Sequence, residues 1–511
     1  GLTLAHSQLH ALQAALTRED RGVTVAVYQE HLITGIWPGL FDQPRGVAID
    51  VGSTTVAAHL CDLNSGEVLV SAGVMNPQIR YGEDLMSRVS YVMMHPEGAE
   101  LLTRAIREAI NGLFIELTSE ASNQVEDILE IALVANPIMH HIALGIDPVN
   151  LGTAPFALTT SDAIDTRAAE MGLNAHPEAR LYCLPCIAGH VGADAAGVIL
   201  AEAPDRNEDM TLVVDVGTNA EIVLANNERL LVCSSPTGPA FEGAQISSGQ
   251  RATIGAIERV QIDRETLEPR FKCIGSELWS DEPGFKETIA GTGVTGICGS
   301  GIIEVVAEMY LAGILSNDGV VDGALAERNQ RIQADGRTFS YVLHASSDPE
   351  VSDVLVTQND VRQIQLAKAA LYAGIKLLMD EMGVATVDRI RLAGAFGSHI
   401  SVSHAMVLGL IPDCNLEQVT SAGNAAGAGA RMALLDRNAR LEIAATIAKA
   451  ERIETAVADD FQAHFVGAMG LPHQSDPFPN LFSVVAPPVV KVLESGNAPK
   501  RRRRRSSRAS A

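Results

Sequence analysis

The sequence predicts an α/β protein built from two similar halves that enclose a ligand site. An apolar run ending in Asp-Val-Gly, a second apolar run, a turn and a third run occupy residues 47–70, and the same succession returns at residues 213–232. Elsewhere, short β-branched runs alternate with long helical patterns, as in proteins whose helices cover a mixed or parallel sheet. The repeat therefore indicates duplicated hairpins, one in each half.

The elements of the first half follow in order along the chain. Residues 1–45 predict a short helix (7–16) and a hairpin that turns at Gln29-Glu30. Because these residues are too few for a domain, we expect the remnant of a linker or middle domain. After the first Asp-Val-Gly hairpin, the pattern predicts helices near 83–94 and 97–120, strands at 128–136 and around 181–187, and a helix after Gly192.

The second half continues the alternation. Apolar residues at three- and four-residue spacing predict an amphipathic helix over 360–382. A strand with a glycine turn (387–400) and a small-residue helix start (423–435) follow it. The expected organisation is a linker or middle-domain remnant at 1–45, a first lobe at 46–205, a second lobe at 206–470, and an extended tail with a polybasic end at 471–511.

The acidic composition limits the partners. The 511 residues carry a formal net charge of −24, although the last twelve, KRRRRRSSRASA, hold seven basic side chains and no acidic one. An acidic body repels nucleic acid and anionic membranes, and no run reaches the ~18 apolar residues of a membrane-spanning helix. Neither a nucleic acid nor a membrane is therefore expected as a partner, and the basic end is expected to be a solvated terminus.

The cysteines indicate the compartment. Seven scattered cysteines fit a reducing environment and, with no secretory signal pattern, predict a cytoplasmic protein. Cys183 and Cys186 form a lone C-x-x-C with Pro185 between them. Because a zinc site needs a second ligand pair and a thioredoxin-like motif should open a helix, we expect these to be buried strand cysteines.

The bend of each repeated hairpin gathers the groups that a nucleotide phosphate needs. Gly52 and Gly217 let backbone amides come close because no side chain intervenes. Asp50 and Asp215 end the first strand of each hairpin and are placed to hold Mg²⁺ through water, since this ion keeps several of its waters. Two such hairpins facing one another predict a clamp for a triphosphate. The neighbouring hydroxyl donors are Ser53, Thr54, Thr55 and Thr218.

These residues also carry a resemblance. Asp50-Val-Gly-Ser-Thr-Thr and Asp215-Val-Gly-Thr-Asn resemble the two phosphate motifs of the acetate and sugar kinase, heat-shock chaperone and actin superfamily, and Leu392-Ala-Gly-Ala-Phe-Gly397 resembles its adenosine motif. The resemblance implies two RNase H-like lobes with an ATP cleft between them. It implies nucleotide contacts from Asn219, Gly394 and Gly397. Lys368 and Gln365 lie on the helix before the adenosine turn, where each either edges the nucleotide or is a solvated helix position.

A narrower resemblance covers residues 46–470. Six strings are similar to the reductive activators of corrinoid proteins: MHHIALGIDP, IAGHVGAD, GPAFEGAQISSGQRA, TGICGSGI, QLAKAALYAGI and GNAAGAGA. This resemblance implies an ATP hydrolase, with Mg²⁺, that drives an electron onto the Co(II) corrinoid of a partner protein in a methyltransferase system, giving Co(I). It also implies an electron donor and allows a homodimer.

The sequence leaves two alternatives for the carrier that delivers the electron. Many members of that family carry an N-terminal ferredoxin-like domain with a two-iron two-sulfur cluster, but no C-x4-C-x2-C spacing occurs in this sequence. Either a cluster domain lies upstream of Gly1 or the electron comes from a separate carrier. We expect an upstream cluster domain, because the first 45 residues resemble the end of a domain.

Two other functions stay open from the sequence. A small-molecule kinase of the same superfamily would need a catalytic carboxylate, and Asp194, which opens a helix, is the nominee; it could instead orient an attacking water or cap its helix. An activator of the 2-hydroxyacyl-CoA dehydratase type would share a cluster through two cysteines per chain. Cys298, however, stands alone in its glycine-rich segment.

Other polar residues are candidates for the cleft. Asn136, just after a strand, could reach the terminal phosphate, whereas His140 and His141 are expected to pack or cap. Glu242 and Arg251 flank a loop and either line the cleft or form a structural ion pair.

Overall fold

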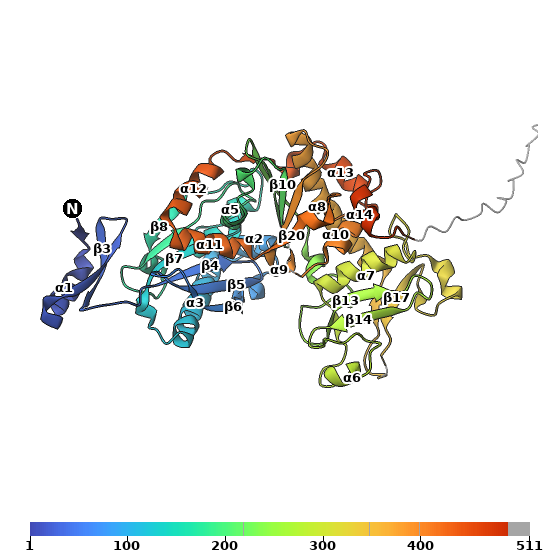
Figure 1. Cartoon of the computed structure of the whole chain (residues 1–511), viewed down its shortest axis with the longest axis horizontal. Coiled ribbons are helices and arrows are strands. Elements are labelled where there is room, and N and C mark those ends of the chain that lie inside the picture. Colours follow the sequence, from blue (N-terminus) through green and yellow to red (C-terminus); the bar gives the residue numbers. More distant parts are fainter. Residues whose placement is uncertain (218, 347, 398, 489–511) are drawn as a thin grey trace, which may run out of the picture.

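The computed structural model shows two α/β lobes and a small N-terminal subdomain (Figure 1). It describes residues 1–217, 219–346, 348–397 and 399–488. In Figure 1 the first lobe lies between the N-terminal subdomain on the left and the second lobe on the right. The predicted α/β class is therefore confirmed.

The N-terminal subdomain consists of helix α1 (Leu9–Leu16) and three strands in the order β1 (Thr3–Leu4), β3 (Leu32–Pro38) and β2 (Val23–Tyr28). The predicted hairpin is confirmed, and Gln29 and Glu30 adopt φ values of 47° and 62° at its turn. The Tyr28 hydroxyl donates to Asp165 of the first lobe at 2.5 Å. The subdomain therefore rests on the first lobe.

The first lobe contains a six-stranded sheet in the order β6 (Val68–Met75), β5 (Thr55–Asp62), β4 (Arg45–Val51), β7 (Ile128–Ala135), β9 (Arg180–Cys183) and β8 (Ile164–Arg167). β4 pairs antiparallel with β5 and parallel with β7, and this central position explains its nearly continuous burial. The helices are α2 (Leu85–Met94), α3 (Gly98–Glu120), α4 (Pro137–Leu144) and α5 (Ala193–Glu202).

Strand β9 is shorter than predicted. It ends at Cys183 and not near residue 187, because Pro185 has no N–H to donate to a neighbouring strand. Cys183 and Cys186 are nonetheless both buried free thiols, so the predicted burial is confirmed, although Cys186 lies outside the strand.

The second lobe repeats this plan. Its sheet runs in the order β20 (Val419–Gly423), β19 (Arg389–Ala393), β10 (Thr211–Val216), β11 (Ala220–Ala225), β12 (Leu230–Ser235) and β21 (Glu451–Arg452). β10 pairs antiparallel with β11 and parallel with β19, just as β4 does with β5 and β7. Its helices are α8 (Gln358–Met382), α9 (Gly394–Gly397), α10 (Val402–Leu408) and α13 (Phe461–Gly467).

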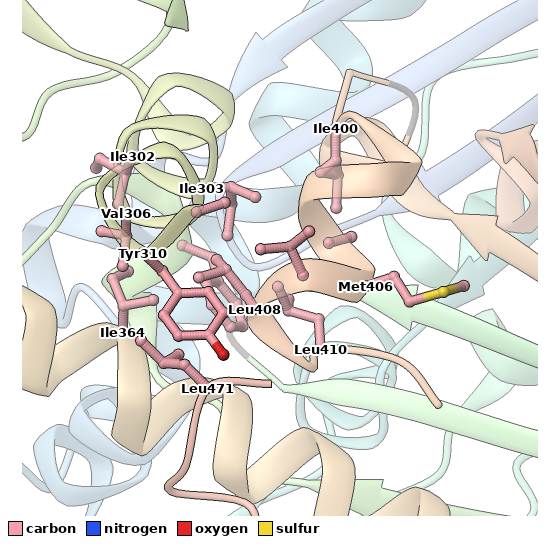
Figure 2. Close-up of a cluster of buried hydrophobic side chains, with 14 of the residues drawn as sticks. Ile302, Ile303, Val306, Tyr310, Ile364, Ile400, Met406, Leu408, Leu410 and Leu471 are labelled. Carbon is pink, nitrogen blue, oxygen red and sulfur yellow. The ribbon is translucent and has the colours of Figure 1, made fainter. Parts of the chain in front are cut away.

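A large insertion separates β12 from α8. It holds two three-stranded sheets and two helices. The first sheet has the order β14 (Pro269–Cys273), β13 (Ala256–Ile262) and β15 (Gly296–Ile297), and the second has the order β16 (Ile332–Asp335), β17 (Thr338–His344) and β18 (Val354–Val356). The helices are α6 (Phe285–Thr288) and α7 (Gly299–Leu311). Figure 2 shows how α7 joins this insertion to the lobe. The side chains packed there belong to one buried core and include Ile302, Ile303, Val306, Tyr310, Ile364, Met406, Leu408 and Leu471.

Two helices that follow the second sheet return to the first lobe. Helices α11 (Ala425–Leu435) and α12 (Arg437–Ile447) lie over the first lobe in Figure 1, and α11 contacts α5, β4 and β7. A Cβ atom at Gly429 would lie 2.0 Å from the Gly197 carbonyl oxygen, so glycine is required at this crossing. Residues 425–447 of the predicted second lobe thus cover the first lobe, because a small-residue face lets α11 pack closely on α5.

The predicted extended tail also needs correction. After the 470s the chain forms α14 (Pro479–Val484), and Phe478 and Leu481 are buried in the core of the second lobe. These two apolar side chains explain why the segment stays packed although it is rich in proline. The polybasic end lies outside the described residues. None of the helices in the described ranges is long and apolar enough to cross a membrane.

Candidate functional site

A cavity of about 420 Å³ lies between the lobes, at the turns of the two repeated hairpins. Its size suits a ligand larger than a metal ion. It is lined by Asp50, Gly52, Ser53, Thr54, Thr55, Ala57, Leu85, Asn136, Asp194, Asp215, Val216, Gly217, Asn219, Glu221, Phe241, Glu242, Gly394, Asn424 and Ala426. Most of the residues proposed from the sequence thus lie around one space. Thr218 lies outside the described residues.

The first hairpin turn is closed by backbone contacts. The Gly52 N–H donates to the Thr55 carbonyl at 3.0 Å, and a Cβ at residue 52 would lie 2.6 Å from that oxygen. The Asn76 side chain donates to the Gly52 carbonyl at 2.9 Å. The glycine is therefore needed for the turn itself, and the turn presents the hydroxyl-bearing residues 53–55 to the cavity.

Five carboxyl groups share the cavity wall, and four of them have raised pKa values. Burial and the nearby Asp194 raise the pKa of Asp50 to about 7, and burial with Asp194 and Asp50 raises the pKa of Asp215 to about 7. Burial raises the pKa of Asp194 to about 6, and burial with Asp194 and Asp215 raises the pKa of Glu221 well above its usual value. Such crowded acids hold protons near neutral pH unless a cation replaces them.

Helix N-termini supply positive potential at the same wall. Asn136 caps α4 by accepting from the Met139 N–H at 3.0 Å, and Asn424 caps α11 by accepting from the Gly427 N–H at 2.8 Å. Asp194 lies in the first turn of α5. The partial positive charge of helix N-termini favours a bound anion such as phosphate.

The two glycines of the adenosine motif have different places. Gly394 lines the cavity with φ of 83°, and a Cβ there would lie 2.4 Å from Asp215 Oδ1. Gly397 is not in the cavity wall; a Cβ there would approach the Leu392 backbone at 3.0 Å. Gly394 thus keeps space beside a site carboxylate, whereas Gly397 lets α9 fold tightly onto β19.

The structure does not place Lys368 at the cavity. Its ammonium group is fully buried and donates to the carbonyls of Pro472, at 2.7 Å, and Gly470, and burial lowers its pKa well below the usual range. Gln365 on the same helix donates to the Met469 carbonyl at 2.7 Å. The proposed nucleotide contact of Lys368 is therefore wrong: the side chain fixes the 469–472 segment.

The remaining candidate residues also differ in whether they line the cavity. Glu242 lines the cavity and accepts from the Thr54 hydroxyl at 3.5 Å, but Arg251 is exposed and contacts the Met75 sulfur at 3.2 Å. His140 and His141 are buried, and the Nε2 of His141 accepts from the Thr159 N–H at 3.1 Å, so this side chain supports a loop.

Sequence reasoning missed two polar residues of the wall. Glu221 is the register partner of Asp215 across β10 and β11, so an acidic residue inside an otherwise apolar strand was the available signal. Asn424 stands between a strand and a small-residue helix, which is a typical N-cap position. In the described part of the chain, no group of three or more His, Cys, Asp or Glu side chains is arranged to hold a metal ion directly.

Two family models match consecutive parts of the chain. The RACo middle region matches residues 45–207, and the C-terminal domain of RACo, the ASKHA domain, matches residues 209–482. The chain belongs to the RACo family. The region named middle thus begins at residue 45, at the end of the residues that we predict to be the remnant of a linker or middle domain. In this family the ASKHA domain implies ATP binding with Mg²⁺.

Relatives of known name support the same family. A solved structure described as a reductive activator for corrinoid, iron-sulfur protein superimposes with a TM-score of 0.80 and 32% identity, covering 93% of this chain and 74% of that one. The predicted resemblance and the superfamily fold are confirmed. Corrinoid activation enzyme RamQ of Eubacterium limosum is 33% identical over 77% of this chain. A [Co(II) methylated amine-specific corrinoid protein] reductase of Methanosarcina barkeri is 24% identical over 89% of this chain and 83% of that protein. The chain spans 64% of the length of RamQ.

Proposed function

We propose that this protein is an ATP-dependent reductive activator of a corrinoid protein. The observation that carries the proposal is the pair of Asp-Val-Gly hairpins whose turns line one cavity between two lobes. The similarity to named corrinoid activators supports the partner. The energy of ATP is needed because Co(II) is reduced to Co(I) only at very low potential.

Each group of cavity residues has its own role in ATP turnover. The hydroxyl groups of residues 53–55 and the capped N-termini of α4 and α11 bind the phosphates. Asp50 and Asp215 hold Mg²⁺ through water, and this ion, when bound, neutralises charge on the transferred phosphoryl group. Asp194 accepts a hydrogen bond from the attacking water and orients it. Closure of the lobes on ATP and their release after hydrolysis change how the partner docks.

We propose that the electron reaches the partner from an iron–sulfur centre outside the 511 residues. The seven cysteines are all buried free thiols and lack ferredoxin spacing. A two-iron two-sulfur domain on the same polypeptide and a separate donor protein both satisfy this proposal. The reduced, buried cysteines also agree with a cytoplasmic location, which we propose for the protein.

Spectroscopy of the cobalt tests the proposed function. A purified Co(II) corrinoid protein is mixed with this protein, a two-iron two-sulfur ferredoxin, a low-potential reductant and MgATP, and the absorption of Co(I) is followed. We expect Co(I) to accumulate with ATP and not with a non-hydrolysable analogue. If ATP is hydrolysed but no Co(I) forms with any corrinoid protein, the partner is wrong and the ATPase assignment stands.

A further inference from the structure

The cavity wall has an unusual charge balance for a nucleotide site. None of its described lining residues is a lysine or an arginine. ATP brings several negative charges, which a single divalent ion does not neutralise. A further cation close to the phosphates is therefore expected on physical grounds. The carboxylates of the wall are Asp50, Asp194, Asp215, Glu221 and Glu242.

Arg88 provides a cation one hydrogen bond behind this wall. It lies on α2, three residues after the lining residue Leu85, and its side chain is fully buried. Its Nη2 donates to the carbonyl of Ser53, a lining residue of the first hairpin turn, at 2.6 Å. Its remaining partners are the Gly82 carbonyl (3.0 Å), the Met139 sulfur (3.0 Å) and the Gln78 side-chain oxygen (3.4 Å).

All of these partners are neutral. No ion pair within the described residues includes Arg88, and the nearest acidic residue on its helix, Asp84, accepts from the Ser87 N–H at 2.7 Å as an N-cap. Burial lowers the pKa of Arg88 to about 10, so the guanidinium is still protonated at neutral pH. The charge of Asp84 opposes this shift, but the guanidinium forms no ion pair with a carboxylate of the described residues, and a buried cation without such a partner is unfavourable in the free protein. A bound anion in front of the turn would compensate it.

We propose that Arg88 is a positioning residue for the nucleotide phosphates: it fixes the Ser53 carbonyl, and its charge, which no ion pair of the described residues neutralises, attracts the phosphates through the first hairpin turn. This inference rests on the proposed ATP function. The proposed role and a purely structural role of Arg88 predict different losses of nucleotide binding. An electrostatic contribution grows with the number of phosphates, whereas a loss of packing affects all nucleotides alike.

Three variants separate charge from packing. Arg88→Lys keeps the cation, Arg88→Gln keeps a donor for the Ser53 carbonyl without the charge, and Arg107→Gln is a control at a half-buried arginine. Arg107 is on α3, and its Nε donates to the Ala143 carbonyl at 3.0 Å and its Nη2 to the Met171 sulfur at 3.8 Å. It also has no ion pair among the described residues, but it does not reach the hairpin turn.

Dissociation constants of AMP, ADP and ATP are measured with Mg²⁺ by competition against a labelled nucleotide, and melting temperatures are recorded. For Arg88→Gln we expect about tenfold weaker ATP binding, a smaller loss for ADP and almost none for AMP. Arg88→Lys should lose less, and Arg107→Gln should bind all three as the wild type does. Equal losses for the three nucleotides, or none, would overturn the proposal. A wild-type protein that binds no nucleotide would instead refute the proposed function.

Discussion

At the scale of single residues, Asp50 and Asp215 are expected to be essential for turnover and unfavourable for stability. Their pKa values of about 7 show that the folded protein disfavours the ionised forms. Asp50→Asn or Asp215→Asn should therefore lower Mg²⁺-dependent ATP turnover by about two orders of magnitude or more. At pH 8 without Mg²⁺, each variant should be more stable by about 1–3 kcal/mol. Steady-state kinetics and urea unfolding check the two effects. Wild-type turnover in either variant would contradict the site.

The same pKa values predict how stability depends on pH. Unfolded aspartates titrate at about 3.9, so between about pH 4 and 7 the native protein binds more protons than the unfolded chain, and its free energy of unfolding falls as pH rises through this window. Urea midpoints from pH 5 to 8 without Mg²⁺ should show the decline. The double variant Asp50→Asn/Asp215→Asn should reduce it, and saturating MgADP should stabilise the wild type more at pH 8 than at pH 5. An equal decline in wild type and double variant would refute the assigned titration.

At the scale of elements, the two glycines of α9 should respond differently to alanine. A Cβ at Gly394 meets Asp215 Oδ1 in a backbone region that alanine adopts with strain. Gly394→Ala should thus disturb both turnover and nucleotide binding. Gly397→Ala presses on the Leu392 backbone at 3.0 Å and should chiefly lower the melting temperature. Turnover, nucleotide binding and thermal unfolding are measured for both variants. Identical effects of the two substitutions would contradict the prediction.

Local patterns predicted most of the elements near the site. Each hairpin has its own apolar periodicity and its own glycine, so Asp50, Gly52, Asp215 and Gly217 could be placed from the sequence. Lys368 could not be placed, because its position on α8 leaves open which distant segment covers it. Its partners, the 470–472 carbonyls, are about a hundred residues away in the chain. The same holds for α11, whose small residues suit close packing on either lobe.

At the scale of the whole molecule, α11 connects the lobes. It begins at the cavity with Asn424, follows the second sheet, and packs on α5 of the first lobe. α5 begins at the same cavity with Asp194. A ligand bound at the two helix N-termini would therefore act on the contact that joins the lobes.

The crossing of α5 and α11 yields the last prediction. A Cβ at Gly429 would lie 2.0 Å from the Gly197 carbonyl, whereas one at Gly112, an exposed position on α3, meets no atom within 4 Å. Gly112→Ala should therefore stabilise the protein by about 0.5–1 kcal/mol, because alanine favours a helix over glycine. Gly429→Ala makes the same chemical change in the same kind of element, so helix propensity cancels between the two variants. It should destabilise the protein by about 1–3 kcal/mol, because overpacking forces the helices apart. It should also shift α5 and α11 at the cavity and weaken MgATP binding, which Gly112→Ala should leave unchanged. Urea unfolding and nucleotide titration of both variants measure this, and a Gly429→Ala protein as stable as Gly112→Ala would show that the lobes are not joined through this contact.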